Sequence, residues 1–187
     1  MSETRVYTTP NQLQLDSFKL AANVVVGKYR PTHILALLRG GGPIGMYIQE
    51  LLTCTYDYRP KLVFATTKRI EGDNGTYTIE TDLDCGQFDA DTQLLVVDDI
   101  FDTGSTMAAI INMLLQVTKN VRSAVVDYKP GKNRTTLTPD YYVNMRASDV
   151  WIVYPHEISC TKQDDIARAF GEEIAQLVLA CNDIASS

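Results

Sequence analysis

The stretch LLVVDDIFDTGST, residues 94–106, decides the fold class of this 187-residue chain. It begins with four apolar residues, a short and bounded run that is typical of a strand buried on both faces of a sheet. Three carboxylates follow, Asp98, Asp99 and Asp102, and the segment TGST then opens a helical pattern. Predicted strands and helices alternate through the centre of the chain, and this alternation predicts an α/β protein with a central parallel sheet.

The polar half of the same stretch predicts a site for a sugar phosphate. Three like charges within five positions repel one another unless a cation or a hydroxyl-rich ligand takes them up. The helix start can offer backbone N–H groups and hydroxyls to an anion, and its residues are Thr103, Gly104, Ser105 and Thr106. A turn that only caps a helix needs one acidic or hydroxyl residue, not three carboxylates followed by TGST. A Walker phosphate loop is excluded, because no Gly-x-x-x-x-Gly-Lys precedes the Ser and Thr residues.

A glycine turn, RGGG at residues 39–42, supplies a second candidate segment. It follows the apolar run 33–38, a predicted buried strand. Backbone without side chains can approach a phosphate closely, and Arg39 adds positive charge, although a plain strand-to-helix turn has the same composition. Ligands of open parallel sheets bind beyond the carboxyl ends of the strands, so both turns are expected to face one cleft.

The remaining sequence predicts further strands and helices, with no internal repeat and no long linker. Helices are expected at residues 11–29, 44–52, 107–117 and 164–181. Strands are expected at 33–38, 62–65, 94–97, 121–127, 141–143 and 150–153. Residues 68–90 are rich in glycine and polar residues and predict either a mobile functional loop or a hairpin, with a short ribbon at 76–79. We therefore expect one domain over residues 1–187.

Composition excludes several classes of protein. A hydrophobic fraction of 45% and a charged fraction of 21% are ordinary for a globular domain. The net charge of −6 disfavours nucleic-acid binding, and no stretch approaches the roughly 18 apolar residues of a membrane helix. No signal-peptide core follows Met1, so we expect a cytoplasmic protein. Four cysteines without Cys-x-x-Cys pairs and two histidines favour neither a zinc ribbon, a disulfide framework nor a histidine-rich metal site.

The segment 94–106, preceded by the glycine turn, resembles the phosphoribosyl-pyrophosphate (PRPP) motif of the type I phosphoribosyltransferases. The resemblance implies a single-domain fold with a central parallel sheet flanked by helices and a small hood. The hood would come from the N-terminal segment and from residues 129–160, and residues 68–90 would form the mobile loop. The Ser-Tyr pair of larger purine enzymes is absent from that loop, so Lys68, Arg69 and Tyr77 are its candidate functional residues, with a solvated hairpin as the alternative.

The resemblance also assigns roles in the PRPP site. Asp98 and Asp99 would bind the ribose hydroxyls, directly or with Mg²⁺, and residues 103–106 would hold the 5-phosphate. Arg39 and Gly40 would bind pyrophosphate, and the peptide between residues 38 and 39 can be cis in this family. Asp102 would act as the catalytic acid/base at purine N7.

Two further segments, VVDYKP at 125–130 and WIVYPHE at 151–157, are similar to the 6-oxopurine branch of the family. By this resemblance Lys129 donates to the purine 6-oxo group, Trp151 stacks on the base, and backbone groups of Ile152 read the purine edge. Glu157 would assist a Mg²⁺ ion or the base. An ammonium suits a carbonyl oxygen and disfavours the amino group of adenine. On the residues alone, Lys129 is equally a solvated strand-end charge and Trp151 a core residue.

The sequence therefore predicts a Mg²⁺-dependent purine-salvage enzyme. It would form a purine nucleoside 5′-monophosphate and pyrophosphate from PRPP and a 6-oxopurine, with hypoxanthine ahead of guanine and xanthine. Two alternatives stay open: a phosphoribosyltransferase for another base, and a regulatory protein that senses PRPP on the same fold. A homodimer or homotetramer is usual in the family, and no residue pattern fixes the number of subunits.

Overall fold

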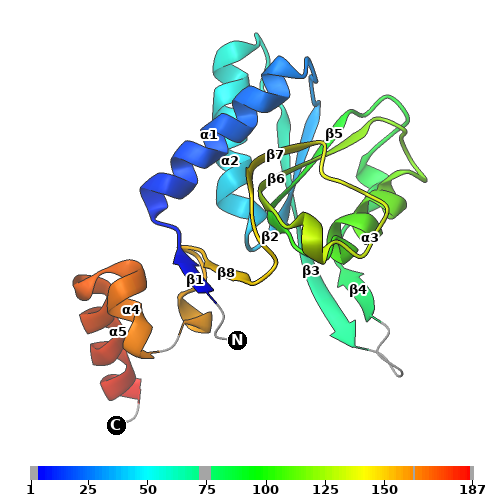
Figure 1. Ribbon diagram of the computed structural model, residues 1–187. Coiled ribbons are helices and arrows are strands. Elements are labelled where there is room, and N and C mark those ends of the chain that lie inside the picture. Colours follow the sequence, from blue (N-terminus) through cyan, green and yellow to red (C-terminus); the bar gives the residue numbers. More distant parts are fainter. Residues whose placement is uncertain (1–3, 72–76, 162, 186–187) are drawn as a thin grey trace. The chain divides into compact units, whose positions relative to one another are not determined.

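The chain divides into two compact units in the computed structural model, which describes residues 4–71, 77–161 and 163–185 (Figure 1). The larger unit is Gln14–Ser148, and the smaller unit joins Met1–Leu13 to Asp149–Ser187. In the described ranges, every helix is too short or too polar to cross a membrane.

A six-stranded sheet forms the centre of the larger unit, in the order β4-β3-β2-β5-β6-β7. All neighbouring strands are parallel except β3 and β4. The strands are β2 (His33–Leu38), β3 (Lys61–Glu71), β4 (Tyr77–Thr81), β5 (Leu94–Phe101), β6 (Val121–Tyr128) and β7 (Tyr141–Met145). The α/β class and the mostly parallel sheet predicted from the sequence are confirmed.

Helices cover both faces of this sheet. They are α1 (Pro10–Val26, in this unit from residue 14 onward), α2 (Gly41–Thr55) and α3 (Ser105–Leu114). The crossover through α2 moves from β2 to β3, and the crossover through α3 moves the opposite way, from β5 to β6. Because parallel crossovers are right-handed, α2 and α3 lie on opposite faces, as Figure 1 shows. The apolar run of β5 is buried between them, which is why it reads as a continuous apolar segment.

The helix predicted at residues 11–29 ends earlier than expected, at Val26. Lys28 adopts a left-handed conformation with φ 57° and donates its N–H to Val25 at 2.9 Å, while Tyr29 donates to Val24 at 3.2 Å. These two bonds form a Schellman motif, which satisfies the last helical carbonyls three residues before the predicted end.

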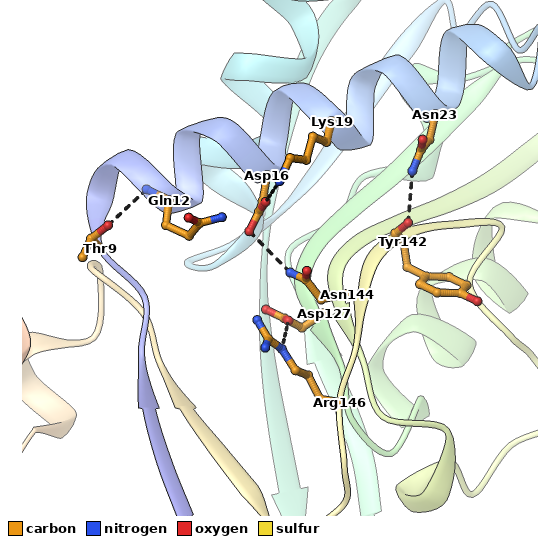
Figure 2. Close-up of polar contacts among 9 residues, drawn as sticks. All are labelled: Thr9, Gln12, Asp16, Lys19, Asn23, Asp127, Tyr142, Asn144 and Arg146. Carbon is orange, nitrogen blue, oxygen red and sulfur yellow. Dashed lines mark hydrogen bonds and ion pairs between the residues drawn. The ribbon is translucent and has the colours of Figure 1, made fainter.

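Buried polar contacts join α1 to the strands beneath it (Figure 2). The Asp16 carboxylate accepts a hydrogen bond from the Asn144 side chain at 3.4 Å and lies 2.9 Å from the Lys19 ammonium.

In β6 the Asp127 carboxylate is fully buried and accepts from Arg146 Nε at 2.6 Å. A buried carboxylate needs such a partner, so this pair belongs to the framework of the unit.

The segment predicted as a loop or a hairpin contains a hairpin. Strand β3 continues to Glu71, well beyond the expected 62–65, and pairs antiparallel with β4, with Lys68 opposite Glu80. The predicted ribbon at 76–79 is confirmed from Tyr77 onward, and residue 76 lies outside the described residues. A short 3-10 helix, η2 (Cys85–Gln87), follows the hairpin.

The smaller unit contains a two-stranded parallel sheet and two helices. Strand β1 (Thr4–Tyr7), which was not predicted, pairs with β8 (Val150–Val153). The single helix expected at 164–181 is wrong: α4 (Gln163–Phe170) and α5 (Glu172–Ala185) are separate. Gly171 between them has φ 97°, a left-handed conformation that ends a helix and that glycine adopts at low cost.

Candidate active site

Three neighbouring strands, β2, β5 and β6, run parallel and end at the same edge of the larger unit's sheet. The residues that directly follow them are Arg39, Asp102 and Lys129. The glycine turn, the carboxylate turn and the candidate base-binding lysine therefore lie along one edge, and the sequence predicted this for the two turns.

A cavity of about 200 Å³ lies where β5 passes into α3. It is lined by Arg69, Asp98, Ile100, Phe101, Asp102, Thr103, Gly104, Ser105, Thr106 and Met107. Helix α3 begins at Ser105, so the N–H groups of its first turn have no helical acceptor, and the positive end of its dipole lies at the cavity. Gly104 has φ 79°, and a Cβ there would overlap the Phe101 ring. This arrangement forms a cup for an anionic group.

The first two carboxylates lie inside β5, which continues to Phe101 rather than ending at Val97 as expected. The backbone N–H of Asp99 donates to Asp98 Oδ1 at 3.0 Å. Burial and the neighbouring charge of Asp99 raise the pKa of Asp98 well above its ordinary value. Asp98 lines the cavity, and Asp99 is buried, with 9% of its surface exposed. A cation or hydroxyl-rich ligand would relieve this accumulation of negative charge.

The glycine turn after β2 lies directly against the second of these carboxylates. The Leu38–Arg39 peptide is cis, as the resemblance implied. A Cβ on Gly40 would overlap the Asp99 carboxylate, and one on Gly41 would overlap the Val97 carbonyl oxygen. Glycine is therefore required for the close approach of the two strand ends. Helix α2 starts within this turn, at Gly41, three residues before the predicted start.

The lysine after β6 is buried and forms an ion pair with the third carboxylate. Lys129 is 3% exposed, and its Nζ lies 3.2 Å from Asp102 Oδ1. The interpretation of Lys129 as a solvated strand-end charge is therefore wrong. A buried ammonium is costly unless it is paired, and the Asp102 carboxylate provides that partner.

Sequence reasoning missed a second lysine at the same carboxylate. Lys132, in the short 3-10 helix η3 (Pro130–Lys132), lies 3.7 Å from Asp102 Oδ1. Its signal was available as a further cation three residues after Lys129 in the same loop. A second cavity of about 290 Å³ adjoins the cup and is lined by Asp102, Thr103, Gly131, Lys132, Asn133 and Arg134. The Arg134 N–H donates to the Thr103 carbonyl at 3.0 Å, which fixes the turn before α3.

The remaining candidates belong to the smaller unit. Trp151 and Ile152 lie in β8, and the Trp151 side chain is 45% exposed, so it is not a core residue of this unit. The Glu157 carboxylate accepts from the Tyr154 N–H at 3.1 Å. The structure thus brings Asp98, Asp102 and residues 103–106 together, whereas the approach of Trp151, Ile152 and Glu157 to them stays a prediction.

The donor set fits a magnesium ion that is shared with a phosphorylated substrate. Within the described part of the chain, no three His, Cys, Asp or Glu side chains are grouped so that they could hold a metal alone. Mg²⁺ usually keeps several waters and binds one or two carboxylates plus substrate phosphates. The adjacent Asp98 and Asp99 carboxylates, one of them beside the cup, are the residues that could hold such an ion.

The fold and the cup define an α/β protein with a candidate anion site at the carboxyl edge of its sheet. Residues 7–158 match the family described as the phosphoribosyl transferase domain, and the chain belongs to this family. No curated protein matches the chain.

Solved structures share this fold. A purine phosphoribosyltransferase from Pyrococcus horikoshii Ot3 is 27% identical with TM-score 0.65, covering 81% of this chain and 93% of the other. A hypothetical protein from Neisseria gonorrhoeae with bound ppGpp is 19% identical with TM-score 0.74, and the match covers 90% of this chain and 97% of the other. The Helicobacter pylori xanthine-guanine-hypoxanthine phosphoribosyltransferase is 18% identical with TM-score 0.62, and the match covers 85% of this chain and 96% of the other.

Proposed function

We propose that this phosphoribosyltransferase-family chain is a Mg²⁺-dependent enzyme that transfers ribose 5-phosphate from PRPP to N9 of a 6-oxopurine. The products would be a purine nucleoside 5′-monophosphate and pyrophosphate, and hypoxanthine is the first base we expect to react. The observation that carries this proposal is the buried Lys129 ammonium, whose Nζ lies 3.2 Å from the carboxylate of Asp102, a residue that lines the cup. An ammonium held there suits a purine carbonyl oxygen and disfavours adenine, whose amino group is a donor.

The cup and the carboxylates would hold PRPP. The backbone N–H groups and hydroxyls of residues 103–106 would bind the 5-phosphate at the start of α3. Asp98 and Asp99 would bind the ribose hydroxyls and Mg²⁺, and the bound ion supplies charge neutralisation at the pyrophosphate. Arg39 and Gly40 would bind the same pyrophosphate. We add Arg69, whose side chain lines the cup from β3.

Asp102 would handle the proton of the reaction. The bond between C1′ and the pyrophosphate oxygen breaks, the bond between N9 and C1′ forms, and the base loses one proton. A carboxylate at the cup can accept that proton, and general-base help is typically worth roughly 10²- to 10⁴-fold in rate. Trp151 would stack on the base and Ile152 would read its edge, with Glu157 assisting Mg²⁺, once the smaller unit contributes them.

The test is nucleotide formation from PRPP and Mg²⁺ with hypoxanthine, guanine, xanthine, adenine and orotate assayed in parallel. We expect turnover with one or more oxopurines only. Turnover with adenine or orotate would contradict the argument from Lys129 and favour a phosphoribosyltransferase for another base. Asp102→Ala should lose roughly 10²- to 10⁴-fold in turnover while staying folded by circular dichroism. Near-normal turnover in this variant would remove Asp102 from the catalytic role.

A regulatory protein that senses a phosphorylated ligand is the second candidate. It is favoured by the similarity of fold to the gonococcal protein with bound ppGpp, which covers 90% of this chain. The anion cup at α3 would suit PRPP or a guanosine polyphosphate equally well. Tight binding of PRPP or ppGpp by calorimetry, together with no turnover of any base, would place this function first.

A further inference from the structure

The loop that follows β6 contacts the turn that forms the cup. The Arg134 N–H donates to the Thr103 carbonyl at 3.0 Å. Thr135 lies against the next residue of the turn, since a Cβ on Gly104 would lie 2.9 Å from Thr135 Oγ1. Two consecutive residues of the loop therefore touch two consecutive residues of the turn.

The hydrogen bond to Thr103 sets the direction of the next N–H group. The peptide between Thr103 and Gly104 is trans, so its C=O and N–H point in opposite directions. Because the carbonyl is directed at Arg134, the Gly104 N–H is directed away from the loop, and Gly104 lines the cup. Among the described residues this N–H has no acceptor, so it can bind an anion.

The peptide needs such a contact because glycine does not fix its orientation. Gly104 has φ 79°, and glycine adopts positive and negative φ about equally readily. A flipped peptide would direct the Thr103 carbonyl oxygen, instead of an N–H, at a bound phosphate. Both groups are hydrogen-bond acceptors, so the cup would lose a donor and gain a repulsive contact.

One side chain folds the loop around Arg134. Asn133 Oδ1 accepts from the Thr135 N–H at 2.8 Å and from the Thr135 hydroxyl at 3.0 Å. Asn133 Nδ2 donates to the Leu137 carbonyl at 2.7 Å. These three bonds join the residue before Arg134 to the residues after it. Leu137 packs against the core cluster that contains Phe101, so the folded loop is anchored beside the cup.

We propose that Asn133 is a positioning residue for the 5-phosphate of the substrate. Through Arg134 it holds the Thr103 carbonyl out of the cup and keeps the Gly104 N–H directed at the phosphate. This inference rests on the proposed function, in which residues 103–106 bind that phosphate. Asn133 acts through the backbone of the loop, so its loss should affect phosphate binding more than the chemical step.

The experiment combines three asparagine variants. Asn133→Ala removes all three side-chain bonds, whereas Asn133→Asp keeps an acceptor for Thr135 and loses the donor to Leu137. Asn23→Ala is the matched control, because Asn23 Nδ2 also donates to a backbone carbonyl, that of Tyr142 at 3.1 Å, on α1 (Figure 2).

Three readouts are compared. Calorimetry gives the Kd of ribose 5-phosphate, a probe that needs no turnover. ¹H–¹⁵N NMR follows the backbone amide signal of Gly104 during the same titration. Steady-state kinetics with hypoxanthine gives KM for PRPP and kcat separately, and thermal unfolding shows that each variant is folded.

We expect Asn133→Ala to raise the Kd of ribose 5-phosphate and the KM for PRPP by roughly two- to tenfold, the range for one hydrogen bond. The change in kcat should be smaller. Ribose 5-phosphate should shift the Gly104 amide signal downfield in the wild type and shift it less in Asn133→Ala. Asn133→Asp should lie between the two, and Asn23→Ala should match the wild type.

An unchanged Kd in folded Asn133→Ala would overturn the proposal, and so would an equal loss in Asn23→Ala. If Asn133→Ala does not fold, Thr135→Val takes its place. This variant removes the hydroxyl that donates to Asn133 and keeps the side-chain volume. A Kd and a Gly104 signal that are both unchanged in Thr135→Val would then overturn the proposal.

The binding of ribose 5-phosphate separates this inference from the proposed function. Weaker binding in Asn133→Ala of a protein that turns over no base would refute the proposed function and still support the role of Asn133. An active wild-type enzyme whose affinity for ribose 5-phosphate does not depend on Asn133 would do the reverse.

Discussion

Gly40 has no room for a side chain, because the Asp99 carboxylate occupies the space that its Cβ would need. Gly40→Ala should displace Asp99 or the turn, at an overpacking cost of about 1–3 kcal/mol. We also expect the KM for PRPP to rise, because the displaced Asp99 is a proposed ligand of the ribose hydroxyls and Mg²⁺. Steady-state kinetics and thermal unfolding measure the two effects.

Gly42→Ala is the comparison within the same turn. A Cβ on Gly42 would lie 3.1 Å from Leu38 Cδ2, the end of a flexible side chain that can move by a few tenths of an ångström. We expect a clearly smaller rise in KM for this variant. Equal losses at both positions would show that any methyl group in the turn is harmful, and that the contact of Gly40 with Asp99 has no special role.

Asp98 should lower the stability of the free protein at neutral pH. Its pKa is raised by burial and by Asp99, so the folded state holds the proton more tightly than the unfolded state does. The stability from this group is therefore present below the ordinary Asp pKa of about 3.9 and is lost as pH rises through the raised folded pKa.

Asp98→Asn should consequently be more stable than the wild type at pH 7, with a flatter dependence of the unfolding free energy on pH above 4. It should also bind PRPP more weakly, because a carboxylate of the ribose site is lost. Urea unfolding across pH 4–8 measures the first effect, with Asp57→Asn at an exposed position as control. A variant that is less stable than wild type at pH 7 would contradict this account of Asp98.

The ion pair between β6 and the end of β7 should contribute to the framework that carries the site. Asp127 is fully buried, so Arg146→Met would leave its carboxylate without the Nε donor at 2.6 Å. Breaking one side of a buried pair typically costs about 3–5 kcal/mol, and partial exposure of Arg146 reduces this to roughly 2–3 kcal/mol.

Arg59→Met is the control for Arg146→Met. The Arg59–Glu50 pair is more than half exposed on both sides and should be worth less than about 1 kcal/mol. Urea denaturation of both variants measures the difference. If Arg146→Met loses no more stability than Arg59→Met, the Asp127 pair does not hold β6 and β7 together.

Elements with a strong local signal were predictable from the sequence, and those decided by backbone conformation were not. The run 33–38 is bounded by polar residues on both sides, and β2 has the predicted limits. Polar composition hid the extension of β5 through Asp98 and Asp99 and the length of β3. The break at Gly171 depends on a left-handed φ that apolar periodicity does not reveal.

The candidate site was predictable to a similar extent. The order of the motifs predicted that Arg39 and Asp102 lie at one sheet edge, because parallel strands share their carboxyl ends. The contact of Lys132 with Asp102 was not predictable, since it depends on how η3 folds the loop back. The assignment of Trp151 and Glu157 to the site stays a prediction, because both residues belong to the smaller unit.

At the scale of the whole molecule, the candidate site combines residues from several separate segments of the chain. The glycine turn after β2, the carboxylates of β5 and the start of α3 would all bind one ligand, so PRPP with Mg²⁺ should bind the folded state selectively. At a ligand concentration 100 times Kd this linkage adds about 2.7 kcal/mol, which corresponds to a Tm rise of roughly 5–10 °C for a chain of this size. Thermal unfolding with PRPP, with Mg²⁺ and with both measures this. Mg²⁺ alone should have little effect, because Asp98 and Asp99 form only a partial site, and EDTA should remove most of the gain from PRPP. Full stabilisation by PRPP in EDTA would show that the cup at α3 binds the ligand without a metal, and would remove Asp98 and Asp99 as magnesium ligands.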